Sequence, residues 1–382
     1  MSERYIGLMS GTSLDGVDGV VYDFAGQTSK VAAKVTAFAT RPFPAELRAE
    51  LLALNSAGNN ELHRAAIAAN ALTRVYAQVV NQLLAQANLA PADICAIGAH
   101  GQTVRHRPGE FDSTGYTLQL NNPALLAELT GIDVVADFRS RDVAAGGQGA
   151  PLVPAFHQDV FANQNKVGQN ESIAVLNIGG ISNLSVLGKH EPSLGFDCGP
   201  GNALMDYWCH LHTGELFDAD GAWAASGQVN QGLLNQLMTE PFIEKTPPKS
   251  TGRDLFNALW LKQQMHGFDD VLPKDVQATL TEFTAFACAK NAINFASSDK
   301  NHSKILIVCG GGALNGHLLR RLQAALPSMT VASSDVFGLP PLHVEAAAFA
   351  WLARKAMRRE TASFKSVTGA QGSRILGAIY PA

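Results

Sequence analysis

Apolar and polar residues alternate along the chain with two different periods, and each period predicts one type of element. Runs of consecutive apolar residues predict short buried strands, at 5–9, 94–98, 133–137, 173–178 and 305–309. Apolar residues spaced three and four apart predict amphipathic helices, at 44–54, 61–87, 122–129, 275–296, 315–325 and 345–357. Strands that alternate with helices predict an α/β protein with a mostly parallel sheet in each domain.

Two segments about 165 residues apart open in the same way, with an apolar strand, a turn of small residues and a returning strand. The first turn is Ser10–Asp18, after the strand at 5–9, and the second is Gly179–Asn183, after the strand at 173–178. Each reads as a β-hairpin whose tip can lie close to a ligand. Because their separation is the size of a domain, the pattern indicates that one domain was duplicated.

The length of the chain also favours two domains, since 382 residues exceed what one ordinary core accommodates. We place the N-terminal lobe at 1–145 and the C-terminal lobe at 146–382, because the glycine-rich stretch 146–151 reads as a hinge. An arrangement in which the helix near 345–358 packs back on the N-terminal lobe stays open.

Composition narrows the class of protein. An apolar fraction of 46% and a charged fraction of 16% are typical of a packed enzyme, and a net charge of −4 indicates no nucleic-acid partner. The sequence has no run of about 18 apolar residues and no apolar leader segment at its start, so no membrane partner is expected. Five cysteines without a C-x-x-C pair favour a reducing compartment, and we expect a cytoplasmic protein.

The first hairpin tip has the chemistry of a phosphate site. Glycines and small hydroxyl residues let backbone N–H groups approach phosphate oxygens. Asp15, helped by Asp18, has the oxygen ligands that Mg²⁺ prefers, either directly or through water. An ordinary turn has a similar composition, which is the alternative. The candidate ATP-binding residues of this tip are Gly11, Thr12, Ser13, Leu14, Asp15, Gly16, Val17 and Asp18.

Two further glycine turns are nucleotide candidates. Gly179 and Gly180 form the second tip, while Gly310, Gly311 and Gly312 connect the strand at 305–309 to the helix at 315–325. Such a turn admits a base or ribose against the backbone, or holds phosphate at a helix N-terminus; a plain tight turn is the alternative. Neither turn fits the Rossmann or Walker A pattern, and Lys249–Thr251 reads as a loop because no G-x-x-x-x-G precedes it.

A catalytic carboxylate is needed if a hydroxyl group or water is to attack. The candidates are Asp15, Asp137, Asp142 and Asp197. We favour Asp197, because it stands at the end of a short strand, before a helix, among residues too small for plain packing. A capping or turn aspartate is the alternative.

Substrate contacts are expected after other strands of the first lobe. His100 follows the strand at 94–98, and Asp137 and Arg139 follow the strand at 133–137. Arg139 can bind a carboxylate through two N–H groups, whereas a surface ion pair is the alternative. Glu345 begins the last long helix, where a carboxylate is also favoured by the helix dipole. His100 fits a structural histidine equally well.

The order of the three glycine turns resembles the actin/hexokinase/Hsp70 superfamily, in which two duplicated ribonuclease H-like lobes bind ATP in a central cleft. Motifs along nearly the whole chain are similar to those of the anhydro-N-acetylmuramic acid kinases. These motifs lie at 8–16, 98–103, 135–139, 145–154, 177–180, 195–202, 248–253 and 309–312.

The resemblance implies a specific reaction. Members of that family convert 1,6-anhydro-N-acetylmuramic acid from recycled peptidoglycan, with ATP and water, to N-acetylmuramic acid 6-phosphate. It implies ATP phosphates at Gly11–Asp18 and Gly179–Gly180, adenosine at Gly310–Gly312, and Asp197 as base. It also implies sugar contacts at His100, Asp137, Arg139 and Glu345.

Two other functions remain open at this stage. A conventional sugar kinase of the same fold would use Asp197 to deprotonate a sugar hydroxyl. An ATP-gated chaperone or filament protein would use the nucleotide to change shape, although the sequence offers no substrate-binding β-domain or helical lid for it. The oligomeric state is not readable from the sequence, and a homodimer is the default expectation.

Overall fold

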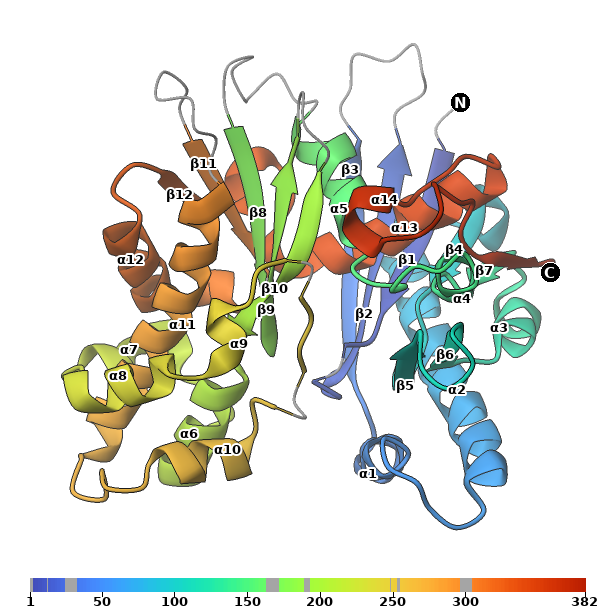
Figure 1. The fold of residues 1–382 in the computed structure, drawn as a ribbon. Coiled ribbons are helices and arrows are strands. Elements are labelled where there is room, and N and C mark those ends of the chain that lie inside the picture. The colour runs from blue at the N-terminus through green and yellow to red at the C-terminus, as the bar shows by residue number, and fades with distance from the viewer. Residues whose placement is uncertain are drawn as a thin grey trace. The chain divides into compact units, whose positions relative to one another are not determined.

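The computed structural model describes residues 3–11, 13–24, 33–162, 172–188, 193–247, 249–252, 255–295 and 304–382. The chain divides into two compact units (Figure 1). Unit 1 contains Met1–Phe156 and His343–Ala382, and unit 2 contains His157–Leu342. No helix among the described residues is long and apolar enough to span a membrane.

This division differs from the boundary expected at 145/146. The segment after His343 belongs to unit 1 as a whole, not only its helix near 345–358. The physical reason is that the end of the chain returns to the first sheet: strand β13 (Ala378–Tyr380) pairs antiparallel with β7 (Val134–Ala136). Residues 146–156 also belong to unit 1.

Unit 1 is built on one mixed sheet with the strand order β13-β7-β4-β1-β2-β3. Strands β1, β2 and β3 are antiparallel neighbours, while β4 is parallel to β1 and β7 is parallel to β4. The remaining strands of this sheet are β1 (Glu3–Met9), β2 (Gly16–Phe24), β3 (Lys34–Pro42) and β4 (Ala96–Ala99); a separate hairpin pairs β5 (Gln102–Pro108) with β6 (Gly115–Leu120).

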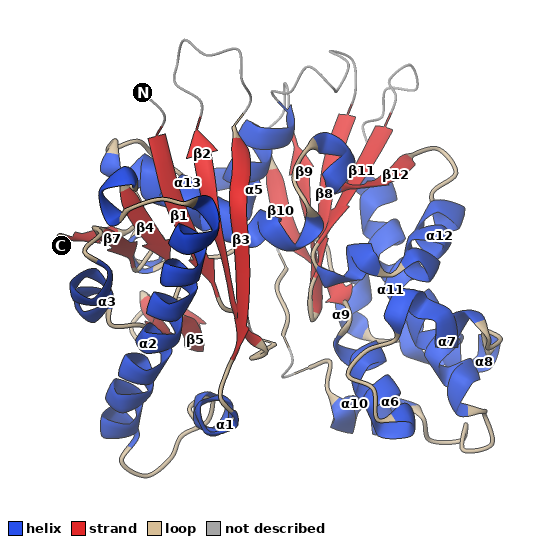
Figure 2. Cartoon of the chain, turned by 180° about the vertical axis from the view of Figure 1, so that it is seen from behind, coloured by secondary structure: helices blue, strands red, loops and turns tan. Residues whose placement is uncertain are grey.

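Helices α2 (Glu61–Ala87) and α13 (Val344–Met357) cover opposite faces of this sheet (Figures 1 and 2). On β1, Gly7 faces α13, and a Cβ there would overlap the carbonyl oxygen of Ala346. Gly98 on β4 faces the same helix, where a Cβ would overlap the carbonyl oxygen of Phe349. Glycine therefore lets the α13 backbone lie directly on the two central strands. The other helices of unit 1 are α1 (Ala45–Ala53), α3 (Pro123–Thr130), α4 (Ser140–Val143) and α14 (Lys365–Thr368).

Unit 2 repeats the same strand order in its own sheet, β10-β9-β8-β11-β12. Three antiparallel strands are again followed by two parallel ones, as in β3-β2-β1-β4-β7 of unit 1. This repetition confirms the expected fold class, two ribonuclease H-like domains of the actin/hexokinase/Hsp70 type. The strands are β8 (Ser172–Ile178), β9 (Ile181–Leu187), β10 (Leu194–Pro200), β11 (Lys304–Cys309) and β12 (Thr330–Ser333).

The core of unit 2 forms where α11 (Pro273–Phe295) and α12 (Gly316–Ala325) pack on the sheet. Fully buried Leu280 and Phe283 of α11 belong to the same buried cluster as Leu176 of β8. The other helices are α6 (Ala203–Thr213), α7 (Ala222–Ala225), α8 (Gln231–Met238), α9 (Pro241–Glu244) and α10 (Ala258–Gln264), while α5 (Val153–His157) contains the boundary between the units.

The longest periodic segments are predicted best. The helices expected at 61–87 and 345–357 correspond to α2 and α13, and the helix expected at 275–296 corresponds to α11. Two strands are shorter than expected, β4 and β7, and β7 covers only Val134–Ala136 of the predicted 133–137. Strands β1, β8 and β11 instead begin one or two residues before the predicted strands and end where these end. Both predicted hairpins are confirmed, since β1 pairs antiparallel with β2 and β8 pairs antiparallel with β9.

Candidate active site

In unit 1, the predicted residues follow the carboxyl ends of parallel strands. The first tip follows β1, His100 follows β4, and Asp137 with Arg139 follows β7. Because these strands run in one direction, their ends meet at one edge of the sheet, where α/β proteins bind ligands. The fold therefore gathers at this edge residues that lie more than a hundred positions apart in the sequence.

Hydrogen bonds fix the first tip to its neighbours. The Ser10 hydroxyl lies 2.8 Å from the Tyr76 hydroxyl and donates to the carbonyl of Gly101 at 3.2 Å. The Gln102 side chain donates to the Gly11 carbonyl at 3.1 Å. These bonds fix the start of the tip to α2 and to the segment after β4, while Asp15 at the tip is exposed.

The remaining residues of the tip differ in exposure. Leu14 is buried with φ of 58°, a left-handed conformation that is uncommon for leucine. Val17 is buried in β2, so only its backbone is available to a ligand. Burial raises the pKa of Asp18, against a hydrogen bond from Thr40, and the nearby Asp15 charge raises it further. Thr12, assigned to ATP from the sequence, lies outside the described residues.

Half-buried Arg139 and buried His100 form a pair at the same edge. The Arg139 Nε and Nη2 groups donate to His100 Nε2 at 3.1 and 2.9 Å, and Nη1 donates to the Gly149 carbonyl at 2.8 Å. Burial and the Arg139 charge hold the pKa of His100 well below its usual value, so the imidazole is neutral. Since Nε2 accepts, the ring proton resides on Nδ1.

The Arg139 charge is preserved despite its surroundings. Burial lowers the pKa of Arg139 to about 10, and the negative charges of Glu345 and Asp142 oppose this effect. The guanidinium is therefore still positive at neutral pH. Within the described residues, three of its five N–H groups are used by His100 and Gly149, which leaves two for an anionic ligand.

Asp137 and Glu345 flank this pair. Asp137 is exposed and has φ of 57°, and its carboxylate accepts from the Ser140 N–H at 3.4 Å. A non-glycine residue in this conformation is a common feature of functional sites. Glu345 is half-buried in the first turn of α13, where its charge acts on Arg139. His106, which was not among the residues predicted from the sequence, lies near the Arg139 charge. Burial lowers the pKa of His106 to about 4, and the positive charge of Arg139 contributes to this shift.

Asp142, a candidate catalytic carboxylate from the sequence, has a structural role here. It is fully buried, and Oδ2 accepts from the Gly149 N–H at 2.8 Å while Oδ1 accepts from the Thr368 hydroxyl at 2.9 Å. Both oxygens are thus occupied in joining the 139–149 loop to α14. The carboxylate is not available to a reactant.

We expect Asp142→Ala to lower the free energy of unfolding by about 2–4 kcal/mol, because it leaves the buried Gly149 N–H and Thr368 hydroxyl without an acceptor. Urea denaturation of the full chain measures this change. Asp269→Ala removes an exposed carboxylate and is the matched control, expected to stay near the wild-type midpoint. An unchanged midpoint for Asp142→Ala would show that the carboxylate is not structural.

In unit 2, three glycine turns meet at the carboxyl ends of β8, β10 and β11. The Gly201 N–H donates to the Gly180 carbonyl at 2.9 Å, and the Asn202 N–H donates to the Gly179 carbonyl at 2.8 Å. The Asn202 side chain donates to the Ile178 carbonyl at 3.2 Å. The second predicted tip is therefore packed against the turn that precedes α6.

The third turn joins the same cluster through Gly310. Its φ is 78°, and a Cβ there would overlap Asn177 Oδ1 and lie 2.7 Å from the Ile178 carbonyl oxygen. Only glycine fits this position. Gly311 is exposed beside it, whereas Gly312 is buried against Ile178. The structure thus brings together the Gly179–Gly180 and Gly310–Gly312 turns that the sequence assigned to one nucleotide.

Asp197 lies in β10 at a β-bulge of the same edge. The register shifts between Asp197 and Gly199, and such a bulge redirects the side chains beside it. Asp197 Oδ2 accepts from the Ser250 hydroxyl at 2.8 Å and from the Thr251 N–H at 2.9 Å. Burial raises the pKa of Asp197, against these two hydrogen bonds and the Lys249 charge. A carboxylate with a raised pKa is a stronger general base than an exposed aspartate.

The segment 249–251 is irregular, as expected from the sequence, but its role was missed. The Asp197 N–H donates to the Lys249 carbonyl at 3.2 Å. Lys249 is buried, and its Nζ donates to the carbonyls of Phe242 and Ile243, both at 3.4 Å. No periodicity marks such a loop, and its hydrogen bonds to Asp197 were therefore not predicted. Pro248 and Arg253 of this motif lie outside the described residues.

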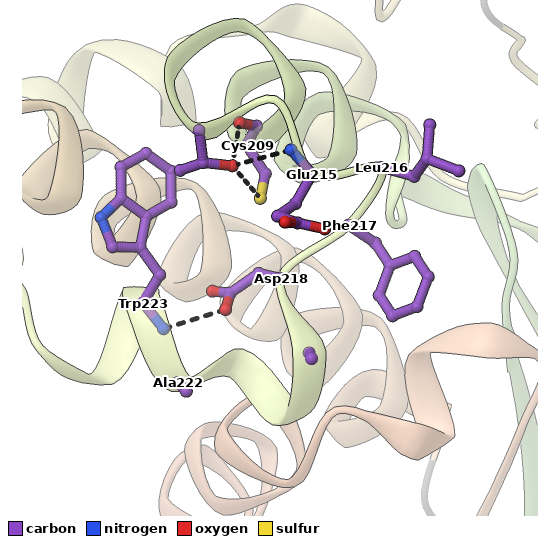
Figure 3. A pocket seen from close by; sticks show the side chains of 9 residues that line it. Cys209, Glu215, Leu216, Phe217, Asp218, Ala222 and Trp223 are labelled. Atoms are coloured by element: carbon purple, nitrogen blue, oxygen red, sulfur yellow. Dashed lines mark hydrogen bonds between the residues drawn. The ribbon is translucent and has the colours of Figure 1, made fainter.

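A hollow of about 460 Å³ lies elsewhere on unit 2 (Figure 3). It is formed by the end of α6, the following loop and α7, with Asp218 accepting from the Trp223 N–H at 2.9 Å. None of its lining residues is a predicted site residue. They are Cys209, Thr213, Glu215, Leu216, Phe217, Asp218, Ala219, Ala222 and Trp223.

Comparison with known proteins gives one consistent family. The model of the family described as anhydro-N-acetylmuramic acid kinase matches residues 3–382. Proteins of that name from Variovorax paradoxus (strain S110) and Albidiferax ferrireducens (strain ATCC BAA-621 / DSM 15236 / T118) are 64% and 61% identical. Both alignments cover 100% of this chain, and they cover 99% and 100% of the two relatives.

Solved structures are similar at lower levels. The activator of the 2-hydroxyisocaproyl-CoA dehydratase from Clostridium difficile, with bound ADPNP, has a TM-score of 0.47 and 11% identity, covering 93% of this chain and 97% of that one. A ROK family glucokinase from Streptomyces griseus, in complex with glucose and AMPPNP, has a TM-score of 0.41 and 12% identity, covering 92% and 99%.

Proposed function

Because this chain belongs to the anhydro-N-acetylmuramic acid kinase family over residues 3–382, we propose that it phosphorylates 1,6-anhydro-N-acetylmuramic acid at the expense of ATP. The reaction consumes water and gives N-acetylmuramic acid 6-phosphate, within the recycling of cell-wall peptidoglycan. Full-length relatives of that name at 64% and 61% identity are the observation that carries this conclusion.

Asp197 is the general base of the proposed mechanism. In the substrate, O6 bridges to the anomeric carbon. Asp197 takes a proton from water as the water oxygen attacks this carbon, as the base of an inverting glycosidase does. The bond from the anomeric carbon to O6 breaks, O6 attacks the γ-phosphorus, and ADP leaves. Since phosphorus captures the departing oxygen, no separate acid is needed. The raised pKa of Asp197 supports this role.

Arg139 is proposed to bind the carboxylate of the substrate. Its two remaining N–H groups and its preserved charge support this role. Neutral His100 orients the guanidinium by accepting two of its hydrogen bonds. Asp137 and Glu345 are proposed as further sugar contacts, since they lie at the same edge of the unit 1 sheet.

The glycine turns are proposed to hold the nucleotide. Gly11–Asp18 and Gly179–Gly180 would approach phosphate oxygens, and Gly310–Gly312 would approach adenosine. Charge on the transferring phosphoryl group is stabilised by such backbone donors and by a metal ion. The anchored first tip and the closely packed turns of unit 2 support rigid placement of these donors.

Mg²⁺ is proposed as the metal, with Asp15 as its protein contact. Among the described residues, no group of three or more His, Cys, Asp or Glu side chains can hold a metal ion. A single exposed carboxylate still fits Mg²⁺, which usually binds through one or two carboxylates, phosphate oxygens and several waters. When bound, the ion would neutralise charge on the phosphates.

A cytoplasmic location and a homodimer complete the proposal. The cysteines Cys95, Cys198, Cys209, Cys288 and Cys309 are free thiols, as suits a reducing compartment. Homodimers are the commonest oligomers among soluble proteins in general, which supports this default.

The position of water oxygen in the product tests the reaction. With ATP, Mg²⁺ and the anhydrosugar in ¹⁸O-water, we expect the label at the anomeric oxygen and none in the phosphate, because water attacks carbon and O6 attacks phosphorus. Mass spectrometry at early times measures the position of the label before the anomeric oxygen of the hemiacetal exchanges with solvent. Label in the phosphate would indicate ATP hydrolysis. A phosphorylated product that keeps its 1,6-bridge would indicate a conventional sugar kinase instead.

A further inference from the structure

The two oxygens of the Asp197 carboxylate have different surroundings. Oδ2 accepts two hydrogen bonds, from the Ser250 hydroxyl at 2.8 Å and from the Thr251 N–H at 2.9 Å. Within the described part of the chain, no hydrogen bond reaches Oδ1. Two donors on one oxygen fix the rotation of the carboxylate group, and the second oxygen is left to a reactant.

The donors come from a segment that is itself anchored. The Lys249 carbonyl accepts from the Asp197 N–H at 3.2 Å, so this segment follows the backbone of β10. On the other side, the buried Lys249 Nζ lies 3.4 Å from the carbonyl oxygens of Phe242 and Ile243, and 4.9 Å from the centre of the Phe242 ring. The Lys249 side chain thereby fixes the segment to α9.

We propose that Ser250 is a positioning residue that acts through Asp197, holding Oδ2 so that Oδ1 is presented to the attacking water. This inference rests on the proposed function, in which Asp197 is the base. A general base must lie within hydrogen-bond reach of the proton that it takes, and a rotating carboxylate meets that condition only part of the time.

Ser250 has a second effect, on basicity. A hydrogen bond to the ionised form of a carboxylate lowers its pKa, and the Ser250 and Thr251 bonds act in this direction against burial. Without the Ser250 hydroxyl, the pKa of Asp197 rises further. The acid limb of the pH profile then moves to higher pH, because protonated Asp197 is inactive as a base.

The test compares Ser250→Ala, Ser250→Thr and the wild-type chain. We expect Ser250→Ala to lower kcat about tenfold, since one charge-assisted hydrogen bond is lost and the Thr251 N–H remains. The acid limb of its kcat profile should move up by about one pH unit. The KM for ATP should stay within about twofold. Ser250→Thr keeps a hydroxyl and should restore both the rate and the profile.

Ser226→Ala is the matched control. Ser226 is exposed in the same unit, and its hydroxyl donates only to the Trp223 carbonyl, at 2.7 Å. It should leave kcat and the acid limb unchanged. If Ser250→Ala loses rate without any movement of the acid limb, or keeps the wild-type rate and profile, the positioning role is overturned.

Failure of the proposed function gives a different result. In that case, the wild-type chain itself would not turn over the anhydrosugar, or Asp197→Asn would keep its full rate. With an active wild type that depends on Asp197, only the behaviour of the Ser250 variants decides the inference.

Discussion

Replacing Asp197 with asparagine is expected to lower kcat by a factor of about 10²–10⁴, the usual effect of losing a general base. The amide keeps the shape and retains an oxygen that accepts from Ser250 and Thr251, but it takes no proton from water. Both ring opening and phosphorylation should fall together, because the departing O6 is the phosphoryl acceptor. Coupled detection of ADP and sugar phosphate measures the two rates in parallel.

The same variant should not be less stable at neutral pH. Because burial raises the pKa of Asp197 in the folded state, the charged carboxylate opposes folding above that pKa, and the penalty disappears below the unfolded value. Asp197→Asn should therefore melt at the wild-type temperature or above it at pH 7. As the pH falls, the melting temperature of the wild type should rise relative to that of the variant.

Two outcomes would contradict this account of Asp197. A variant that keeps more than a tenth of the wild-type rate would show that the base lies elsewhere. A variant that melts well below the wild type at pH 7 would show that the lost rate reflects unfolding and not chemistry.

Replacing Gly7 with alanine should have the largest effect on stability, a loss of roughly 3–5 kcal/mol. The new Cβ would overlap the Ala346 carbonyl oxygen and lie 2.6 Å from the Ala350 nitrogen, both in the backbone of α13. A flexible side chain could turn away, but a helix backbone must move as a unit. Chemical denaturation of the full chain, followed by far-UV circular dichroism, measures the loss.

Gly58→Ala is the control for this substitution. A Cβ at Gly58 would lie 3.0 Å from Arg64 Nη1, the far end of a long, half-buried side chain and not a backbone atom. We expect a change within about 0.5 kcal/mol, as for most surface substitutions. If Gly7→Ala were as stable as Gly58→Ala, the close packing of α13 on β1 would be disproved.

The features that the sequence predicted are those with a local pattern. The 27 residues of α2 repeat their apolar positions often enough to define a helix without any tertiary information. The glycine tips stood out because the same strand, turn and returning strand occur twice, about 165 residues apart. Asp197 stood out because it is the one carboxylate in the glycine-rich segment 195–202, between a strand and a helix.

The features that it missed depend on contacts between distant positions. Asp142 and Thr368 are 226 positions apart, and no local pattern marks their hydrogen bond. Ser250 lies 53 positions after Asp197 in a loop without periodicity. The pairing of β13 with β7 was not predicted either, since a strand of three residues is too short for a recognisable alternation of apolar and polar residues.

The division of unit 1 into two stretches of chain has a consequence for biosynthesis. Residues 157–342 are continuous, so unit 2 has all its strands once the ribosome has passed them. Unit 1 then still lacks α13, and the glycine faces of β1 and β4 stay uncovered until residues 344–357 emerge. We therefore expect the second half of the nascent chain to acquire protease resistance before the first, which is the reverse of the usual vectorial order.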